Sequence, residues 1–137
     1  MFSKYISITY RQYQYYMRKA LKKYKIGNSD YPILLCLNNN PGICQNEVSR
    51  LTKLNKSLIS KGVKKLIEYK YLHQEYDIHH KQKQQLFLTK SGEKILPDLE
   101  DIINHWKKII FKDLTASEIE TLYKAIKKID QNSMTIK

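Results

Sequence analysis

Apolar residues recur along most of the chain at the three- and four-residue spacing of amphipathic helices. This spacing predicts three helices in the first part of the chain, over residues 5–24, 32–37 and 44–52. The segment Gly27-Asn28-Ser29-Asp30 breaks the first helix, and we expect Ser29 or Asp30 to cap the second. In the third helix we expect Val48 and Leu51 to face the core.

A fourth helix is predicted from Asn55 or Lys56 to Tyr69, directly after a turn at Lys53-Leu54. One face of this helix is apolar and consists of Ile59, Val63, Leu66 and Ile67. The opposite face is basic and polar and consists of Lys56, Ser57, Ser60, Lys61 and Lys64. Two helices joined by a tight turn have the layout of a helix-turn-helix.

Beyond the fourth helix the pattern becomes that of a β-hairpin. Tyr71–Tyr76 and Gln85–Leu88 are the predicted strands, and the polar segment from Asp77 to Lys83 is the predicted turn. The tip of this hairpin carries His79, His80, Lys81 and Lys83.

Two helices are predicted to close the chain, the first of them capped by Thr89. Its apolar stripe consists of Ile95, Leu99, Ile102, Ile103, Trp106, Ile109 and Ile110. The last helix begins with the capping box Thr115-Ala116-Ser117-Glu118. It is expected to bury Ile119, Leu122, Tyr123, Ile126 and Ile129. With the first helix, these two carry more apolar surface than a monomer of this layout covers easily, which predicts a dimer.

These elements predict a mainly α fold with a small β-hairpin wing. We expect a winged helix-turn-helix with long N- and C-terminal dimerisation helices. Residues 1–137 are expected to form a single domain, with the winged lobe at about 29–90 and the dimerisation helices at about 1–26 and 91–131.

The charge of the chain indicates an anionic partner. Lys and Arg number 25 against 13 Asp and Glu, for a formal net charge of +12. Double-stranded DNA fits better than a membrane, because neither a strongly basic amphipathic terminal helix nor a lipidation signal is evident. Lys4 and Arg11 interrupt the start of the chain before any signal-like run, so we expect a cytoplasmic protein. Cys36 and Cys44 are expected to be reduced, packed thiols, with a redox-sensing pair as the alternative.

Two groups of side chains are candidates for contact with DNA. The lysines suited to neutralising phosphates are Lys53, Lys56, Lys61, Lys64, Lys65, Lys81 and Lys83. The residues suited to reaching base edges are Asn55, Ser57 and Ser60, with Lys56 and Lys61 able to contact guanine. The alternatives are that Asn55 serves only as the helix cap and that the lysines form an ordinary solvated face. Lys65 and Lys70 remain ambiguous between the two.

Catalytic and metal-binding signatures give no support to an enzyme. The phosphate-loop, zinc-protease and serine-hydrolase motifs are absent from the sequence, so we predict neither an enzyme nor a cofactor. Asp77, His79 and His80 lie near His73, but adjacent hairpin residues point to opposite faces, which argues against a metal site. The tyrosines of the first helix suit an aromatic ligand, but the helical spacing of Tyr13, Tyr16 and Tyr24 favours packing.

Three segments together resemble the MarR family of winged-helix regulators. Pro41–Leu51 is similar to the family's helix before the turn, Leu54–Leu66 to its recognition helix, and Tyr71–Gly92 to its wing with the Leu-Thr-x-x-Gly exit. The chain departs from the family in the wing, with Gln74 at a frequent arginine, Lys70 at the usual glycine, and His80, Lys81 and Gln82 in place of an arginine-rich pattern.

The resemblance implies an effector cleft between the dimerisation helices and the DNA-binding lobe. Together with the residue pattern, it leads us to expect a homodimeric, sequence-specific transcriptional repressor on a pseudo-palindromic operator, released by a small molecule or another signal. The alternative is a winged-helix module for protein contact or non-specific nucleic-acid binding.

Overall fold

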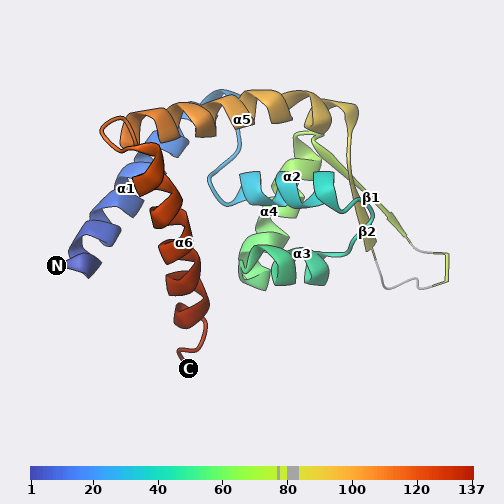
Figure 1. Ribbon diagram of the computed structural model, residues 1–137. Coiled ribbons are helices and arrows are strands. Elements are labelled where there is room, and N and C mark those ends of the chain that lie inside the picture. Colours follow the sequence, from blue (N-terminus) through green and yellow to red (C-terminus); the bar gives the residue numbers. More distant parts are fainter. Residues whose placement is uncertain (77, 80–83) are drawn as a thin grey trace. The chain divides into compact units, whose positions relative to one another are not determined.

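The computed structural model describes residues 1–76, 78–79 and 84–137. The elements follow in the order α1 (Phe2–Leu21), η1 (Lys22–Tyr24), α2 (Asp30–Asn39), α3 (Gln45–Thr52), α4 (Lys56–Glu68), β1 (Leu72–Tyr76), β2 (Gln84–Leu88), α5 (Lys90–Ile110) and α6 (Ala116–Ser133), as Figure 1 shows. This confirms the predicted mainly α fold with a β-hairpin. The chain divides into two compact units, Met1–Ile103 and Asn104–Lys137, which are described separately below.

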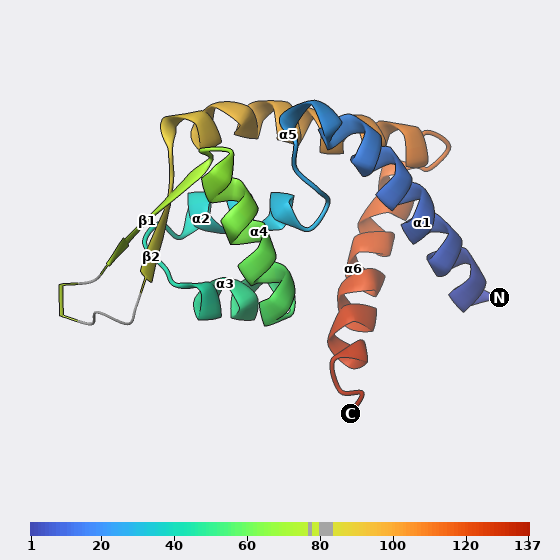
Figure 2. The same cartoon turned by 180° about the vertical axis from the view of Figure 1, so that it is seen from behind.

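In the first unit, α2, α3, α4 and the hairpin form a small lobe, seen from both sides in Figures 1 and 2. Strands β1 and β2 pair antiparallel from Leu72 opposite Leu88 to Tyr76 opposite Gln84. The loop before α3 adds to this hairpin, because Gly42 N donates to Leu86 O at 2.8 Å and Leu86 N donates to Ile43 O at 3.0 Å. These bonds tie the base of the wing to the start of the helix-turn-helix.

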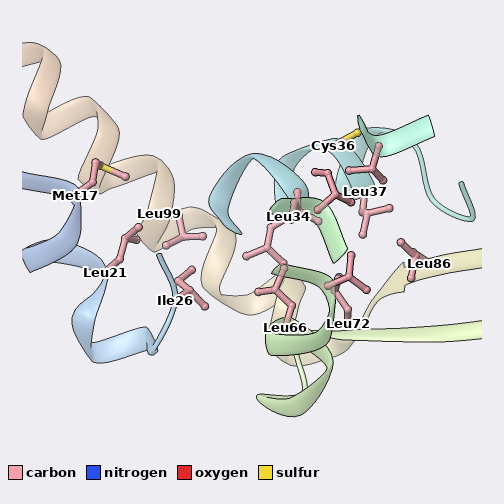
Figure 3. Close-up of a cluster of buried hydrophobic side chains, with 14 residues drawn as sticks. Met17, Leu21, Ile26, Leu34, Cys36, Leu37, Leu66, Leu72, Leu86 and Leu99 are labelled. Carbon is pink, nitrogen blue, oxygen red and sulfur yellow. The ribbon is translucent and has the colours of Figure 1, made fainter. Parts of the chain in front are cut away.

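The core of the first unit consists of two neighbouring groups of side chains (Figure 3). One group joins α1, the loop before α2 and α5 through Met17, Leu21, Ile26 and Leu99. The other fills the lobe and includes Leu34, Leu37, Leu66, Leu72 and Leu86. Burial of these apolar side chains is the main force that holds the helices of the lobe around α4.

Several tyrosines pack against this core, and two of them donate hydrogen bonds to backbone carbonyl groups. The Tyr16 hydroxyl donates to Ile102 O at 2.8 Å, and the Tyr71 hydroxyl donates to Tyr24 O at 3.0 Å. Tyr13, Tyr16 and Tyr24 all pack against the core, as their helical spacing indicates.

The helix ends follow the predicted capping chemistry with one exception. Thr115 and Glu118 form the full capping box of α6, and Gly92 N donates to the Thr89 hydroxyl at 3.1 Å. Ser29, by contrast, makes no side-chain cap for α2. Instead α2 begins at Asp30, ahead of the predicted start, and Asp30 Oδ2 accepts from Gly27 N at 2.7 Å.

Gly92 explains the glycine of the Leu-Thr-x-x-Gly exit. A Cβ at this position would collide with the carbonyl oxygen of Tyr71. The first turn of α5 can therefore approach the backbone before β1 closely only because residue 92 has no side chain.

Leu51 does not face the core as predicted, since 44% of it is exposed. On α3, Val48 is fully buried. Leu54, just after the turn, packs against the core and Leu51 does not.

The second unit contains the last residues of α5 and all of α6. Phe111 meets Tyr123 edge to face, with 6.2 Å between the ring centroids. The predicted burial of the α6 apolar face is wrong for the single chain, because Leu122, Tyr123, Ile126 and Ile129 are each between 38% and 43% exposed. Ile119 alone in the predicted set is partly buried. Among the described helices, none is long and apolar enough to cross a membrane.

Candidate nucleic-acid interface

The turn between α3 and α4 is held by short polar contacts. Lys53 ends α3 in the left-handed region, with φ of 61°, and its N–H donates to Ser49 O at 2.9 Å. The Ser49 hydroxyl donates in turn to Leu54 O at 2.7 Å. These contacts set the direction in which α4 leaves the turn.

Asn55 is the N-cap of α4. Its side-chain oxygen accepts from Leu58 N at 2.8 Å, which satisfies one of the free N–H groups at the helix start. A bidentate contact with adenine would need this same amide oxygen. The structure thus shows the capping role, and contact of Asn55 with a base remains a prediction.

The other predicted residues of α4 lie on one face. Lys56, Ser57, Lys61 and Lys64 are exposed, and Ser60 is partly exposed. The opposite side of the helix is buried and consists of Ile59, Gly62, Val63 and Leu66. The hydrophobic period of the sequence therefore separated these two faces correctly, and it places three cations and two hydroxyls where a ligand can reach them.

Close packing against α2 fixes the position of α4. A Cβ on Gly62 would lie 2.6 Å from Ile33 Cδ1 and 2.8 Å from Asp30 Oδ1, so a larger residue would have to displace these two side chains. The exposed face of α4 thus belongs to a helix whose opposite side packs closely against α2.

Asp30 makes a second connection between α2 and α4. It is 4% exposed, and its Oδ2 accepts from Lys65 Nζ at 3.0 Å as well as from Gly27 N. Lys65, ambiguous in the sequence, thus has a protein carboxylate as its partner, and we do not group it with the exposed lysines. Sequence reasoning missed this pair, because no local signal links two residues that are 35 positions apart.

The hairpin presents a largely polar surface. His73, Gln74, Glu75, Tyr76 and His79 are exposed. The His73 ring stacks on Phe87 with 5.4 Å between centroids, and His73 Nε2 lies 3.4 Å from Glu75 Oε1. His80, Lys81 and Lys83, also predicted to contact DNA, and Asp77 lie outside the described residues.

Lys70 adopts the conformation that glycine favours. Its φ is 65°, in the left-handed region, at the position where the family that the sequence resembles usually has glycine. Two bonds hold it there, from Lys70 N to Ile67 O at 3.0 Å and from the Thr89 hydroxyl to Lys70 O at 2.5 Å. The chain thus keeps the backbone turn into the wing without the glycine.

Neither cysteine is in a disulfide. Cys36 is buried, and burial raises the pKa of its thiol, which disfavours the reactive thiolate. Cys44 is partly buried at the N-cap of α3. Among the residues that the structure describes, no group of three His, Cys, Asp or Glu side chains is placed to hold a metal ion.

Residues of the lobe are similar to a known protein family, and most of the chain is similar to a curated protein. The family described as winged helix-turn-helix DNA-binding matches residues 28–72. The HTH-type transcriptional regulator BilQ of Clostridioides difficile is 27% identical over 114 residues, which is 83% of this chain and 77% of BilQ.

Solved structures match nearly the whole chain. A MarR transcriptional regulator from Methanosarcina mazei is 27% identical, with a TM-score of 0.87 over 99% of this chain and 91% of its own. A MarR mutant from E. coli in complex with operator DNA gives a TM-score of 0.82 at 16% identity, over 93% of this chain and 91% of that one. PcaV from Streptomyces coelicolor, in complex with its natural ligand, gives a TM-score of 0.78 at 20% identity, over 93% of this chain and 91% of PcaV. The last two likenesses concern the fold alone.

Proposed function

We propose that this chain, a DNA-binding transcriptional regulator of the MarR winged-helix type, acts as a homodimeric repressor. In this proposal the two α4 helices of the dimer enter successive major grooves of a pseudo-palindromic operator, and the wings contact the flanking DNA. The protein works by binding and not by catalysis, in the cytoplasm where the operator lies.

The exposed face of α4 is the observation that carries the proposal. Lys56, Lys61 and Lys64 offer positive charge for phosphates, and Ser57 and Ser60 are short enough to approach base edges. These side chains stand on a helix whose start is capped and whose opposite face is packed against α2. Recognition of one sequence needs such a fixed helix, because hydrogen bonds to bases depend on position.

Exposed apolar side chains support the homodimer. Phe2, Tyr5 and Ile6 of α1 are 59%, 67% and 44% exposed, and the apolar face of α6 is exposed as well. An exposed apolar face on a helix, as each of these two helices has, often marks an interface. We propose that a second copy of the chain covers these faces, joined mainly through apolar contacts, since two chains of net charge +12 would otherwise repel each other.

A group of tyrosines supports release by a small molecule. Tyr13 and Tyr31 are partly buried in the first unit, and burial is the main cause that raises the pKa of both hydroxyls. Nearby groups raise these pKa values further, Tyr10 that of Tyr13, and Tyr13 and Glu100 that of Tyr31. PcaV shares this fold and was solved with its natural ligand. We propose that a ligand with an aromatic ring or hydrogen-bonding groups binds near these hydroxyls and weakens operator binding.

Binding selection from random DNA tests the proposed function. The full-length protein is incubated with a random duplex pool, and the enriched sequence is compared with a scrambled duplex at the same salt concentration. A specific regulator should prefer its operator by about a thousandfold or more. Equal affinity for both duplexes would instead favour the alternative, a module for non-specific nucleic-acid binding or for protein contact. A reporter gene placed behind the enriched sequence then distinguishes repression from activation.

A further inference from the structure

Leu58 lies on the first turn of α4, among the side chains proposed to read DNA. It is 39% exposed, and its backbone N–H is the one held by the Asn55 cap. Ser57 precedes it, and Lys61 follows three residues later on the adjoining part of the helix surface. Sequence reasoning passed over Leu58 because it looked only for polar residues at this site.

Exposure alone would not distinguish Leu58, since single exposed leucines are common on protein surfaces. Its position does, because the N-terminal residues of a recognition helix are the ones that reach base edges. The buried face of α4 is complete without it, formed by Ile59, Gly62, Val63 and Leu66.

The polar groups on the face of α4 offer little discrimination between bases. Arginine is the residue that most often reads guanine, yet the arginines of the sequence are Arg11, Arg18 and Arg50, outside α4. Arg50 Nη2 is moreover bonded to Glu47 Oε2 at 2.8 Å. Serine hydroxyls donate and accept, so they accommodate several bases, and lysine acts as a mobile point charge.

The major groove offers one apolar group on its base edges, the 5-methyl group of thymine. We propose that Leu58 packs against this methyl group and makes thymine the preferred base at one position of each operator half-site. The inference rests on the proposed function, in which α4 enters the major groove. It adds the identity of the base and the residue that selects it.

Replacement of thymine by deoxyuridine tests the contact directly, because it removes the methyl group and keeps every hydrogen-bonding group of the base. In the operator enriched from the random pool, each thymine is replaced in turn at the matching position of both half-sites. We expect wild-type protein to bind one of these duplexes about fourfold more weakly for each half-site, the factor for one methyl group returned to water. Leu58→Ala should bind the thymine and deoxyuridine duplexes equally.

Two variants serve as controls. Leu58→Met keeps an apolar side chain and should keep the preference for thymine, whereas Lys64→Ala should bind both duplexes more weakly with the same ratio between them. Because Leu58 is exposed, Leu58→Ala should unfold at the wild-type temperature. If it does not fold, two results would still overturn the inference: a wild-type protein indifferent to every deoxyuridine replacement, or a Leu58→Met protein that loses the preference for thymine.

Two results would overturn the inference while the proposed function stands. One is a wild-type protein that prefers its operator but is indifferent to every deoxyuridine replacement. The other is a Leu58→Ala protein that keeps the full preference for thymine. A wild-type protein that does not distinguish operator from scrambled DNA would instead overturn the proposed function, and this inference with it.

Discussion

Helices α4 and α6 are both amphipathic, but they differ in where the apolar face goes. In α4, 13 residues long, Ile59, Val63 and Leu66 are at most 1% exposed. In α6, 18 residues long and described in full, no residue is buried. The difference indicates that the lobe has its own core, whereas in the proposed homodimer the apolar face of α6 would be covered by the second copy.

The two helices therefore expose different kinds of surface. Because the apolar face of α4 is satisfied within the chain, its polar face is free to meet a ligand of opposite charge. The apolar face of α6 is itself the surface that remains to be covered. The predictions below test this division, in order of decreasing expected effect.

The largest effect is expected from matched leucine truncations in the two helices. Leu66→Ala in α4 removes a side chain that is fully buried, and it should lower the free energy of unfolding by about 2–5 kcal/mol. Leu122→Ala in α6, where the side chain is 40% exposed, should have a much smaller effect on the stability of the monomer. Urea unfolding of both variants, monitored by circular dichroism over a range of protein concentrations, measures the difference. If both variants lose the same free energy of unfolding at low protein concentration, the proposed difference between α4 and α6 is wrong.

A charge in the apolar face of α6 should separate the dimer. Ile126→Glu places a carboxylate where 38% of an isoleucine is exposed, and burying that charge in an apolar interface is costly. We expect a monomer in analytical ultracentrifugation and a loss of operator affinity of about a hundredfold or more, because the two half-sites are then bound independently. Lys127→Glu, at an exposed position beside it, changes more charge and serves as the control. A dimeric Ile126→Glu protein would place the interface elsewhere.

The ion pair of Asp30 and Lys65 should help to hold α4 in place, and it should contribute little to the attraction between the protein and DNA. Lys65→Ala leaves the buried Asp30 carboxylate without its cation, and we expect it to lower stability by about 1 kcal/mol, a modest value because the Lys65 side chain is 43% exposed. The slope of log affinity against log salt should remain close to that of the wild type. A slope reduced by a full unit would mean that Lys65 contacts phosphate after all.

In contrast to Lys65→Ala, Lys64→Ala is expected to change the salt dependence of DNA binding and leave the stability unchanged. It is the smallest of the expected effects. The Lys64 side chain is exposed, so thermal stability should be unchanged, while the salt slope should fall by about one unit as one phosphate contact is lost. Ser57→Ala and Lys61→Ala should instead change the preference among operator variants. If all three variants lower affinity equally on every DNA sequence, base recognition does not lie on this face.

Much of the fold and of the candidate site followed from local patterns. The hydrophobic period separated the polar face of α4 from its buried face, and the Thr115–Glu118 capping box marked the start of α6, as the structure confirms. The same period could not tell which apolar faces would find cover. Leu51 and Ile126 have the spacing of core residues, but whether a core lies opposite them depends on elements elsewhere in the chain or on another chain.

The sequence by itself determined the helices, the hairpin and most of the helix caps, because each depends on residues within a few positions of one another. It also determined the sign of the charge, which is a sum over residues and needs no fold. The tertiary structure decided how α4 is held. A Cβ on Gly62 would meet the side chains of Ile33 and Asp30 in α2, Lys65 pairs with a carboxylate from another helix, and Gly92 lies against the Tyr71 carbonyl. Lys70 lies in the left-handed region, where its carbonyl oxygen accepts from the Thr89 hydroxyl. These features arise from contacts between segments far apart in sequence, and such contacts exist only once the chain has folded.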